Sequence, residues 1–176
     1  AFSLTGLQLQ GSDRANYVFA GNSLSGTGTI TPKALSVTAS ALDKTYDGTT
    51  AATGNLSTVN VIGQDDVRLS WGPVAFASKD VSRDAQGQVQ AQVVNFAGVQ
   101  LSGLDAGNYS VNSTALSRAK ITPKLLSASG TSVANKSQDG NTQASAQIGS
   151  LSGLVGSEQL QAQAVASFGS ALAGSN

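Results

Sequence analysis

The sequence contains no cysteine, no methionine and no histidine. These absences remove thiol nucleophiles, soft metal ligands and the side chain that moves protons near neutral pH. Serine is abundant, but no G-x-S-x-G motif surrounds any serine, and only lysines or carboxylates remain as bases. Aromatic residues make up 5% of the chain, which is little for a glycosidase that must hold a sugar. We therefore expect a protein that is not an enzyme and that is stabilised without disulfides.

Charged residues are also scarce, at 11% of the chain, and ten basic residues balance ten acidic ones. Because no segment concentrates basic charge, the chain lacks the electrostatic surface that binds nucleic-acid phosphates. No apolar run reaches the length of a membrane span, so we expect no membrane insertion. The surface must be formed by Ser, Thr, Asn, Gln and Gly, and its weak charge repulsion suits close packing of neighbouring copies.

The most informative feature that is present is an internal repeat. The tetrapeptide Ile-Thr-Pro-Lys occurs at residues 30–33 and again at 121–124, so the second copy begins 91 residues after the first. The residues before each copy also align, 4–17 with 96–109. The alignment divides the chain into the end of one repeat (1–33), one complete repeat (34–124) and the beginning of another (125–176).

Small or apolar residues alternate with polar ones along most of the chain, which is the period of a half-buried strand. The alternation occurs in residues 87–93, 7–10, 35–39, 67–71, 99–102 and 109–112. Turn signals such as Asp-Gly separate these runs. The predicted fold class is all-β, with tandem β-sandwich (Ig-like) modules joined by short extended strands. The alternative is a β-grasp-like module with one short helix.

Residues 157–168 carry competing helix and strand patterns. Their composition favours a helix by propensity alone. The repeat aligns residues 160–164 of this segment with residues 67–71, which run on into Pro73 and cannot be an undisturbed helix interior. We predict a strand.

The joint between repeats is short, with one proline, Pro32 or Pro123, and no glycine. Proline fixes its own φ in the extended region and restricts the preceding residue to the same region. We therefore predict a stiff joint, in which the last strand of one module leads directly into the first strand of the next.

Three motifs follow one another through the complete repeat: Thr45-Tyr-Asp-Gly-Thr-Thr50, Asp105-Ala-Gly-Asn-Tyr109 and Ile121-Thr-Pro-Lys124. Together they resemble the YDG-type repeat of filamentous-haemagglutinin-like adhesins, the large bacterial surface proteins exported by two-partner secretion. The last segment departs from the pattern, because Gln138 stands in the place of the tyrosine. The resemblance implies tandem repeats in a protein that is secreted to the bacterial outer cell surface.

Tyr46-Asp47-Gly48 is the most conspicuous candidate site. In a structural turn, Asp47 bonds its own downstream backbone, Gly48 supplies a positive φ and Tyr46 covers the module end. In a ligand loop, Tyr46 would stack on a sugar. The second copy keeps Asp-Gly but not Tyr, which favours the turn. The turn and joint residues that we predict to be structural are Asp47, Gly48, Gly107, Pro32 and Pro123.

Asp65 and Asp66 are the other candidate ligand residues. With further aspartates they would supply enough oxygen atoms for calcium if the side chains converge. The chain has neither EF-hand spacing nor a calcium-binding Gly-rich nonapeptide. We expect solvated turn carboxylates and no cofactor, with calcium at Asp65 and Asp66 as the alternative. Trp71, on an alternating run, is predicted to anchor the core.

The predicted function is a stalk segment of a secreted adhesin, a rigid spacer in cell adhesion or in a biofilm matrix whose partners are neighbouring repeats of the same polypeptide. The alternative is a carbohydrate-binding module that recognises an exopolysaccharide or host glycan through the loops at Tyr46 and at Asp65 and Asp66. The segments 1–33 and 125–176 together have nearly the length of one repeat, which suggests that they associate with each other or with neighbouring chains.

Overall fold

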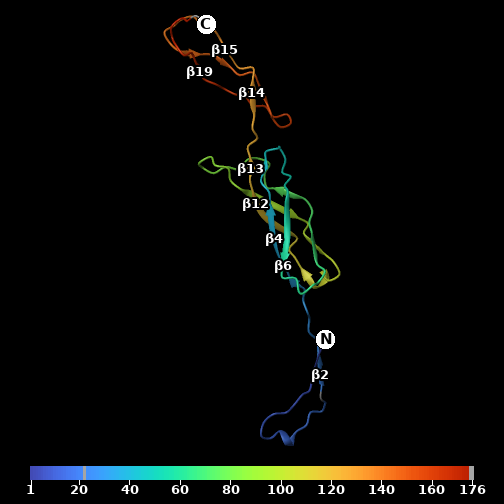
Figure 1. Cartoon of the computed structure of the whole chain (residues 1–176). Coiled ribbons are helices and arrows are strands. Elements are labelled where there is room, and N and C mark those ends of the chain that lie inside the picture. The colour runs from blue at the N-terminus through green and yellow to red at the C-terminus, as the bar shows by residue number, and fades with distance from the viewer. Residues whose placement is uncertain (22, 175–176) are drawn as a thin grey trace.

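The structure, a computed structural model, describes residues 1–21 and 23–174; Asn22 and residues 175–176, the end of the third predicted segment, lie outside it. Figure 1 shows three parts in line: an N-terminal hairpin, a central domain and a C-terminal segment. The described residues form short strands and two 3-10 turns, η1 (Arg14–Asn16) and η2 (Ala106–Asn108). The all-β prediction is confirmed, and the α-helix of the alternative fold is not found in this part of the chain. No helix among the described residues is long and apolar enough to cross a membrane.

The first half of the central domain is built on one hairpin. Strand β4 (Ser36–Ala41) pairs antiparallel with β6 (Gly54–Val59), with Ala39 opposite Leu56. Every second residue of β4 is partly buried, as its alternating sequence predicts. The other strands of this half are β3 (Lys33–Ala34), β5 (Lys44–Thr45), β7 (Arg68–Ser70) and β8 (Val74–Phe76).

The second half of the central domain pairs with the first. Strand β9 (Gln92–Ala97) lies between β12 (Thr114–Ala119) and β8, antiparallel to both. Strand β10 (Gln100–Ser102) pairs antiparallel with β7. Strands β11 (Tyr109–Ser110) and β13 (Ile121–Thr122) pair parallel with β3 and β5. Neither half is complete alone, because each supplies strands that hydrogen-bond to the other.

The core lies where the two halves meet. Val94, Phe96 and Ile121 are fully buried there, and burial of a side chain of this size contributes about 1.5–3 kcal/mol. Gly54 allows the close approach of the aromatic ring, since a Cβ at this position would lie 2.5 Å from Phe96 Cζ. Trp71 is partly buried against the same cluster, as predicted for a core anchor.

The two ends of the chain form small sheets. The N-terminal hairpin consists of β1 (Phe2–Thr5) and β2 (Ser23–Gly26). The C-terminal segment pairs β14 (Ser127–Ser129) with β18 (Ser150–Ser152), β15 (Ser132–Val133) with β17 (Ala146–Gln147), and β16 (Gln143–Ala144) with β19 (Ala166–Ser167). Every buried apolar residue of the described chain lies between Leu35 and Ile121, so the end segments have no buried core of their own.

The strand predicted at 87–93 is wrong in extent, because β9 begins only at Gln92. The run begins in a turn, in which Asp84 Oδ1 accepts hydrogen bonds from the backbone N–H groups of Gln86 (3.0 Å) and Gln88 (2.8 Å), and it continues with a single β-bridge from Val89 to Arg83. An aspartate that bonds its downstream backbone makes a turn whatever the polarity of the residues that follow.

Residues 7–10 and 157–168 also differ from prediction. Residues 7–10 form no strand, and of 157–168 only Ala166–Ser167 is a strand, with no helix. The repeat aligns the first of these segments with β10 and the second with the region of β7, and those two strands are each other's partners in the central domain. Alternation alone forms no strand when its pairing partner is not alongside.

Candidate functional site

The turn after β5 is closed by the side chain of Lys44. Its Nζ donates hydrogen bonds to Asp47 Oδ1, to the carbonyl oxygen of Thr49 and to that of Ala51, each at 2.8 Å. The ammonium group lies 5.5 Å from the centre of the Phe76 ring, and the lysine side chain is only 17% exposed. A cation shielded in this way binds the turn more firmly than a solvated surface pair would.

Asp47 and Gly48 shape the turn. Asp47 Oδ1 accepts hydrogen bonds from the backbone N–H and the hydroxyl of Thr49, both at 2.9 Å. Gly48 has a φ of +77°, which residues with a side chain rarely adopt. A Cβ at Gly48 would also lie 2.9 Å from Val155 Cγ1. This glycine therefore serves both the turn and its close contact with the C-terminal segment.

The same turn is built a second time in the C-terminal segment. Lys136 Nζ donates to Asp139 Oδ1 (2.8 Å) and to the carbonyl oxygen of Asn141 (2.9 Å), and it lies 6.0 Å from the centre of the Phe168 ring. Gly140 has a φ of +82°. Two copies with one geometry indicate that the Lys-x-x-Asp-Gly spacing encodes the turn.

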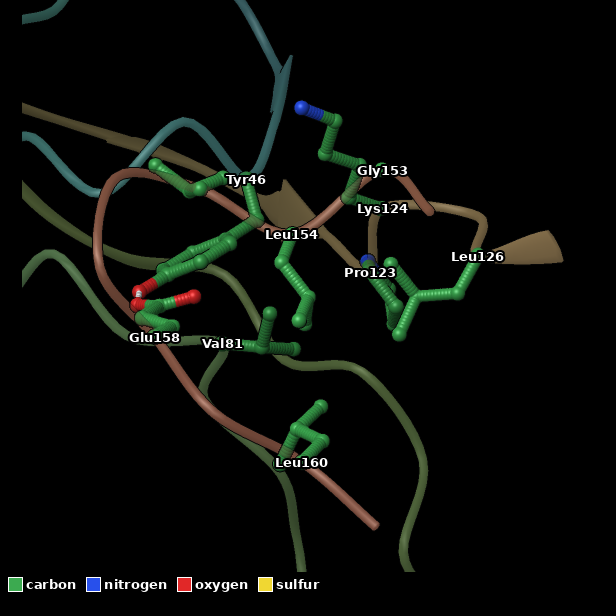
Figure 2. Close-up of a pocket in the computed structure, with 10 residues that line it drawn as sticks. Tyr46, Val81, Pro123, Lys124, Leu126, Gly153, Leu154, Glu158 and Leu160 are labelled. Carbon is green, nitrogen blue, oxygen red and sulfur yellow. Dashed lines mark hydrogen bonds between the residues drawn. The ribbon is translucent and has the colours of Figure 1, made fainter. Parts of the chain in front are cut away.

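Tyr46 lies where the central domain meets the C-terminal segment, as Figure 2 shows. Its hydroxyl donates a hydrogen bond to Glu158 Oε1 and accepts one from Lys79 Nζ at 3.5 Å. The hydrogen bond to Glu158 raises the pKa of the Tyr46 hydroxyl above its ordinary value, because it stabilises the protonated hydroxyl. Because Tyr46 and Glu158 belong to different repeats, this contact spans the joint.

An apolar hollow of about 210 Å³ lies beside Tyr46. Pro123 and Leu126 of the joint and Leu154 of the C-terminal segment are among the residues that line it. The side chain of Lys124 points away from the hollow (Figure 2). The surfaces that meet at the joint are therefore mainly apolar around the polar contact of Tyr46 with Glu158.

A second hollow lies at the other joint, where the N-terminal hairpin leads into the central domain. Pro32, Asp65, Gly107 and Tyr109 are among its lining residues. The buried Tyr109 donates from its hydroxyl to Asp65 Oδ2 (2.5 Å) and accepts from the backbone N–H of Ile62 (2.9 Å). The hydrogen bond to Asp65 raises the pKa of Tyr109. This end is held by bonds within the central domain.

The lysine-closed turn at Lys44 belongs to a region that a family comparison assigns. Residues 31–116 match the model of the YDG domain. The chain contains a YDG domain. No curated protein and no solved structure matches the chain. We use the name YDG domain for the whole central domain including β13, because Ile121 is fully buried in its core; the predicted boundary at Lys124 stays a prediction.

The two parts of the predicted ligand loop lie apart. Tyr46 is at one end of the YDG domain, and Asp65 and Asp66 are at the other. Asp66 Oδ1 pairs with Arg68 Nε at 3.0 Å, and Asp65 is held by Tyr109. Within residues 1–21 and 23–174 no three acidic side chains gather as metal ligands. Calcium at Asp65 and Asp66 stays a prediction.

The predicted structural residue Gly107 shares its loop with a second glycine, Gly103, which was not among the predicted residues. Gly107 lies in η2 without a positive φ, and a Cβ there would meet nothing within 4 Å. Gly103 has a φ of +117°, and its Cβ would lie 2.1 Å from the carbonyl oxygen of Asp66. The geometric need for glycine in this loop is therefore at Gly103 rather than at Gly107.

Sequence reasoning did not single out Lys44, Lys79 or Glu158 as site residues. A signal existed for Lys44, because the repeat keeps a lysine three residues before each Asp-Gly, at Lys44 and Lys136. No comparable signal existed for Glu158, since nothing in a sequence pairs a glutamate with a tyrosine in the preceding repeat.

The carboxylate of Asp47, in the turn closed by Lys44 (the YDG turn), should become protonated only at unusually low pH. The hydrogen bond from Lys44, followed by those from the N–H and hydroxyl of Thr49, lowers the pKa of Asp47 to about 2. An aspartate in the unfolded chain has a pKa of about 3.9. The stability that the folded protein gains from the ionised Asp47 is therefore fully present above that pH and is lost as the pH falls through about 2. We expect the carboxyl carbon signal of Asp47 in an NMR titration to have its midpoint near pH 2.

The matched variant for this titration is Lys44→Met, which removes the charge but keeps most of the side-chain length. It should move the Asp47 midpoint upward, toward the ordinary value. A midpoint near about 4 in the unmodified protein would show that the lysine-closed turn is not formed in solution.

Proposed function

We propose that the chain is a non-catalytic stalk segment of a secreted bacterial adhesin, which acts at the outer cell surface as a rigid spacer in cell adhesion or in a biofilm matrix. The observation that carries the proposal is the contact between the YDG turn and the following repeat, through Tyr46 and Glu158. This contact adds to the covalent link, so bending at the joint must break it.

The joint itself leaves little freedom. Only residues 123–126 separate β13 from β14, and they contain Pro123 and no glycine. Tyr46 and Gly48 contact the C-terminal segment on one side of these residues, at Glu158 and Val155. A short backbone link combined with side-chain contacts restrains both bending and rotation, as an array of spacers requires.

The exported setting rests on the resemblance of the three ordered repeat motifs to those of bacterial surface adhesins, and the polar, weakly charged composition without cysteine, methionine or histidine is compatible with it. The location can be tested by labelling cells with an antibody raised against the chain, before and after permeabilisation. Binding to intact cells of the encoding bacterium is expected, and reactivity only after permeabilisation would contradict an outer-surface location.

A second candidate function is binding of an exopolysaccharide or host glycan, and the observation that favours it is the apolar hollow beside Tyr46. Tyr46 is already engaged by Glu158 and Lys79, which supports the spacer instead. A glycan array separates the two functions. Saturable binding that Tyr46→Ala abolishes, while the fold stays intact, would replace the spacer proposal.

Loss of the contact between Tyr46 and Glu158 should let the C-terminal segment move more freely relative to the YDG domain. Dyes attached through Ser57→Cys and Ser145→Cys would be unique labels, because the chain has no cysteine of its own. In single-molecule fluorescence resonance energy transfer, we expect the parent protein to show a single narrow distribution of transfer efficiencies between the two dyes. Glu158→Ala, which leaves the YDG domain unaltered, and Tyr46→Ala should both broaden it.

The matched control for this measurement is Tyr17→Ala, which removes an exposed tyrosine that follows η1 in the N-terminal hairpin and is not part of the joint at residues 123–126. It should leave the distribution unchanged. Equal widths for the parent protein, Glu158→Ala and Tyr46→Ala would mean that the contact does not restrain the joint.

A further inference from the structure

The first and last segments of the YDG domain run side by side in the same direction. We call residues 33–45 the entry segment and residues 109–122 the exit segment. Strand β3 pairs parallel with β11 near the start of both segments, and β5 pairs parallel with β13 at the end of both. The offset between paired residues changes by only one residue from the first pair to the second. Strands β4 and β12, which lie between these pairs, also contact each other.

The pair of β5 with β13 is held by side chains as well as by the backbone. The N–H of Lys44 donates to the carbonyl oxygen of Lys120 at 3.0 Å. The N–H of Tyr46 donates to the carbonyl oxygen of Thr122 at 2.8 Å. Asp43 Oδ1 accepts the N–H of Lys120 at 2.6 Å, and Thr122 Oγ1 donates to the carbonyl oxygen of Lys44 at 3.2 Å. These bonds cross from one segment to the other.

Both segments are also anchored against sliding. Ala119 and Ile121 of the exit segment are buried in the core. In the entry segment, Lys44 Nζ donates to the carbonyl oxygens of Thr49 and Ala51, each at 2.8 Å, and so ties β5 to the YDG turn. A displacement of either segment along its own axis would therefore withdraw apolar side chains from the core or break the lysine-closed turn.

Tension along the chain would act parallel to these segments. Figure 1 shows the N-terminal hairpin beyond one end of the YDG domain and the C-terminal segment beyond the other, with β13 at that second end. A pull on the two flanking parts draws the entry and exit segments in opposite directions, so they must slide past each other. The evenly spaced hydrogen bonds of a parallel pair are then loaded together rather than one after another, which raises the barrier that governs forced unfolding.

We propose that the YDG domain bears tension along the chain, and that the parallel pairing of its entry and exit segments is the load-bearing clamp. The inference goes beyond the spacer function, because a spacer needs stiffness against bending whereas this clamp resists stretching. It depends neither on the outer-surface location nor on the contact between Tyr46 and Glu158.

Optical-tweezers unfolding of the 176-residue chain in two directions tests the proposal. Handles attach only at introduced cysteines, because the chain has none of its own, and the three positions used are exposed. Thr29→Cys/Lys124→Cys loads the clamp in shear. Thr29→Cys/Gly107→Cys places both handles at the start of the two segments and peels β3 from β11 bond by bond. The YDG domain should unfold at a clearly higher force in the first direction. Equal forces, or a lower force in the first direction, would overturn the proposal.

Asp43→Ala removes one bond of the clamp. It should lower the unfolding force in the shear direction and leave the peeling force unchanged, because peeling starts at β3 and β11. The matched control is Asp80→Ala, which removes an exposed aspartate paired with Lys79 and should change neither force. Trp71 fluorescence reports that the domain is folded in every variant. An unchanged shear force in Asp43→Ala, or an equal loss in both directions, contradicts the clamp.

Discussion

Replacing Phe96 with alanine is expected to lower the free energy of unfolding of the YDG domain by about 3–5 kcal/mol. Phe96 is completely buried on β9, the strand between β8 and β12, and its ring packs on Gly54. Because Gly54 has no side chain to move into the space, the cavity would stay open. Since a domain is stable by about 5–15 kcal/mol in total, this loss is a large share.

Urea unfolding followed by the fluorescence of Trp71, the only tryptophan, measures this effect in the YDG domain. The control is Leu116→Ala on β12, which removes a well-exposed leucine and should change the unfolding free energy by less than about 0.5 kcal/mol. Equal losses for the two variants would show that the core is not centred on Phe96.

Gly103→Ala is expected to destabilise the YDG domain by at least about 2 kcal/mol, although it adds only one methyl group. The φ of +117° at Gly103 is unfavourable for alanine, and the new Cβ would lie 2.1 Å from the carbonyl oxygen of Asp66. That oxygen accepts the backbone N–H of Asp105 at 3.2 Å, so relieving the clash disturbs the pairing of the two loops.

Gly107→Ala is the matched control in the same loop. With no positive φ and an open space around the new methyl group, it should change the unfolding free energy by less than about 0.5 kcal/mol. Destabilisation by Gly107→Ala as large as that by Gly103→Ala would contradict the backbone geometry of this loop. For both variants, urea unfolding of the YDG domain is followed by the fluorescence of Trp71.

The features that were predicted from the sequence are those that depend on local chemistry. Asp47 and Gly48 were expected in a turn because aspartate bonds its downstream backbone and glycine accepts a positive φ, and both occur there. The all-β class followed from alternation repeated over many segments. Trp71 was assigned to the core from its neighbours on one strand.

The features that could not be predicted depend on pairing across the fold. Residues 7–10 alternate as β10 does but have no strand beside them, and the alternating residues 87–91 follow a turn held by Asp84 and form only a single β-bridge, between Val89 and Arg83. The contact between Tyr46 and Glu158 depends on how one repeat meets the next. Periodicity reports which face of a strand is apolar and carries no information about what lies against that face.

The most direct test of the central claim, that neighbouring repeats touch through the YDG turn, is a disulfide between them. A Cβ at Gly48 would lie 3.9 Å from Val155 Cβ, within the range of about 3.5–4.5 Å that a disulfide spans. The double variant Gly48→Cys/Val155→Cys should form an intramolecular bond under mild oxidation. Gly63→Cys/Val155→Cys also replaces a glycine of positive φ, but this glycine lies between Ile62 and Asp65, which line the hollow at the other joint, so this pair should not form the bond. If the first pair oxidises within the monomer no faster than the second, the repeats do not meet as described.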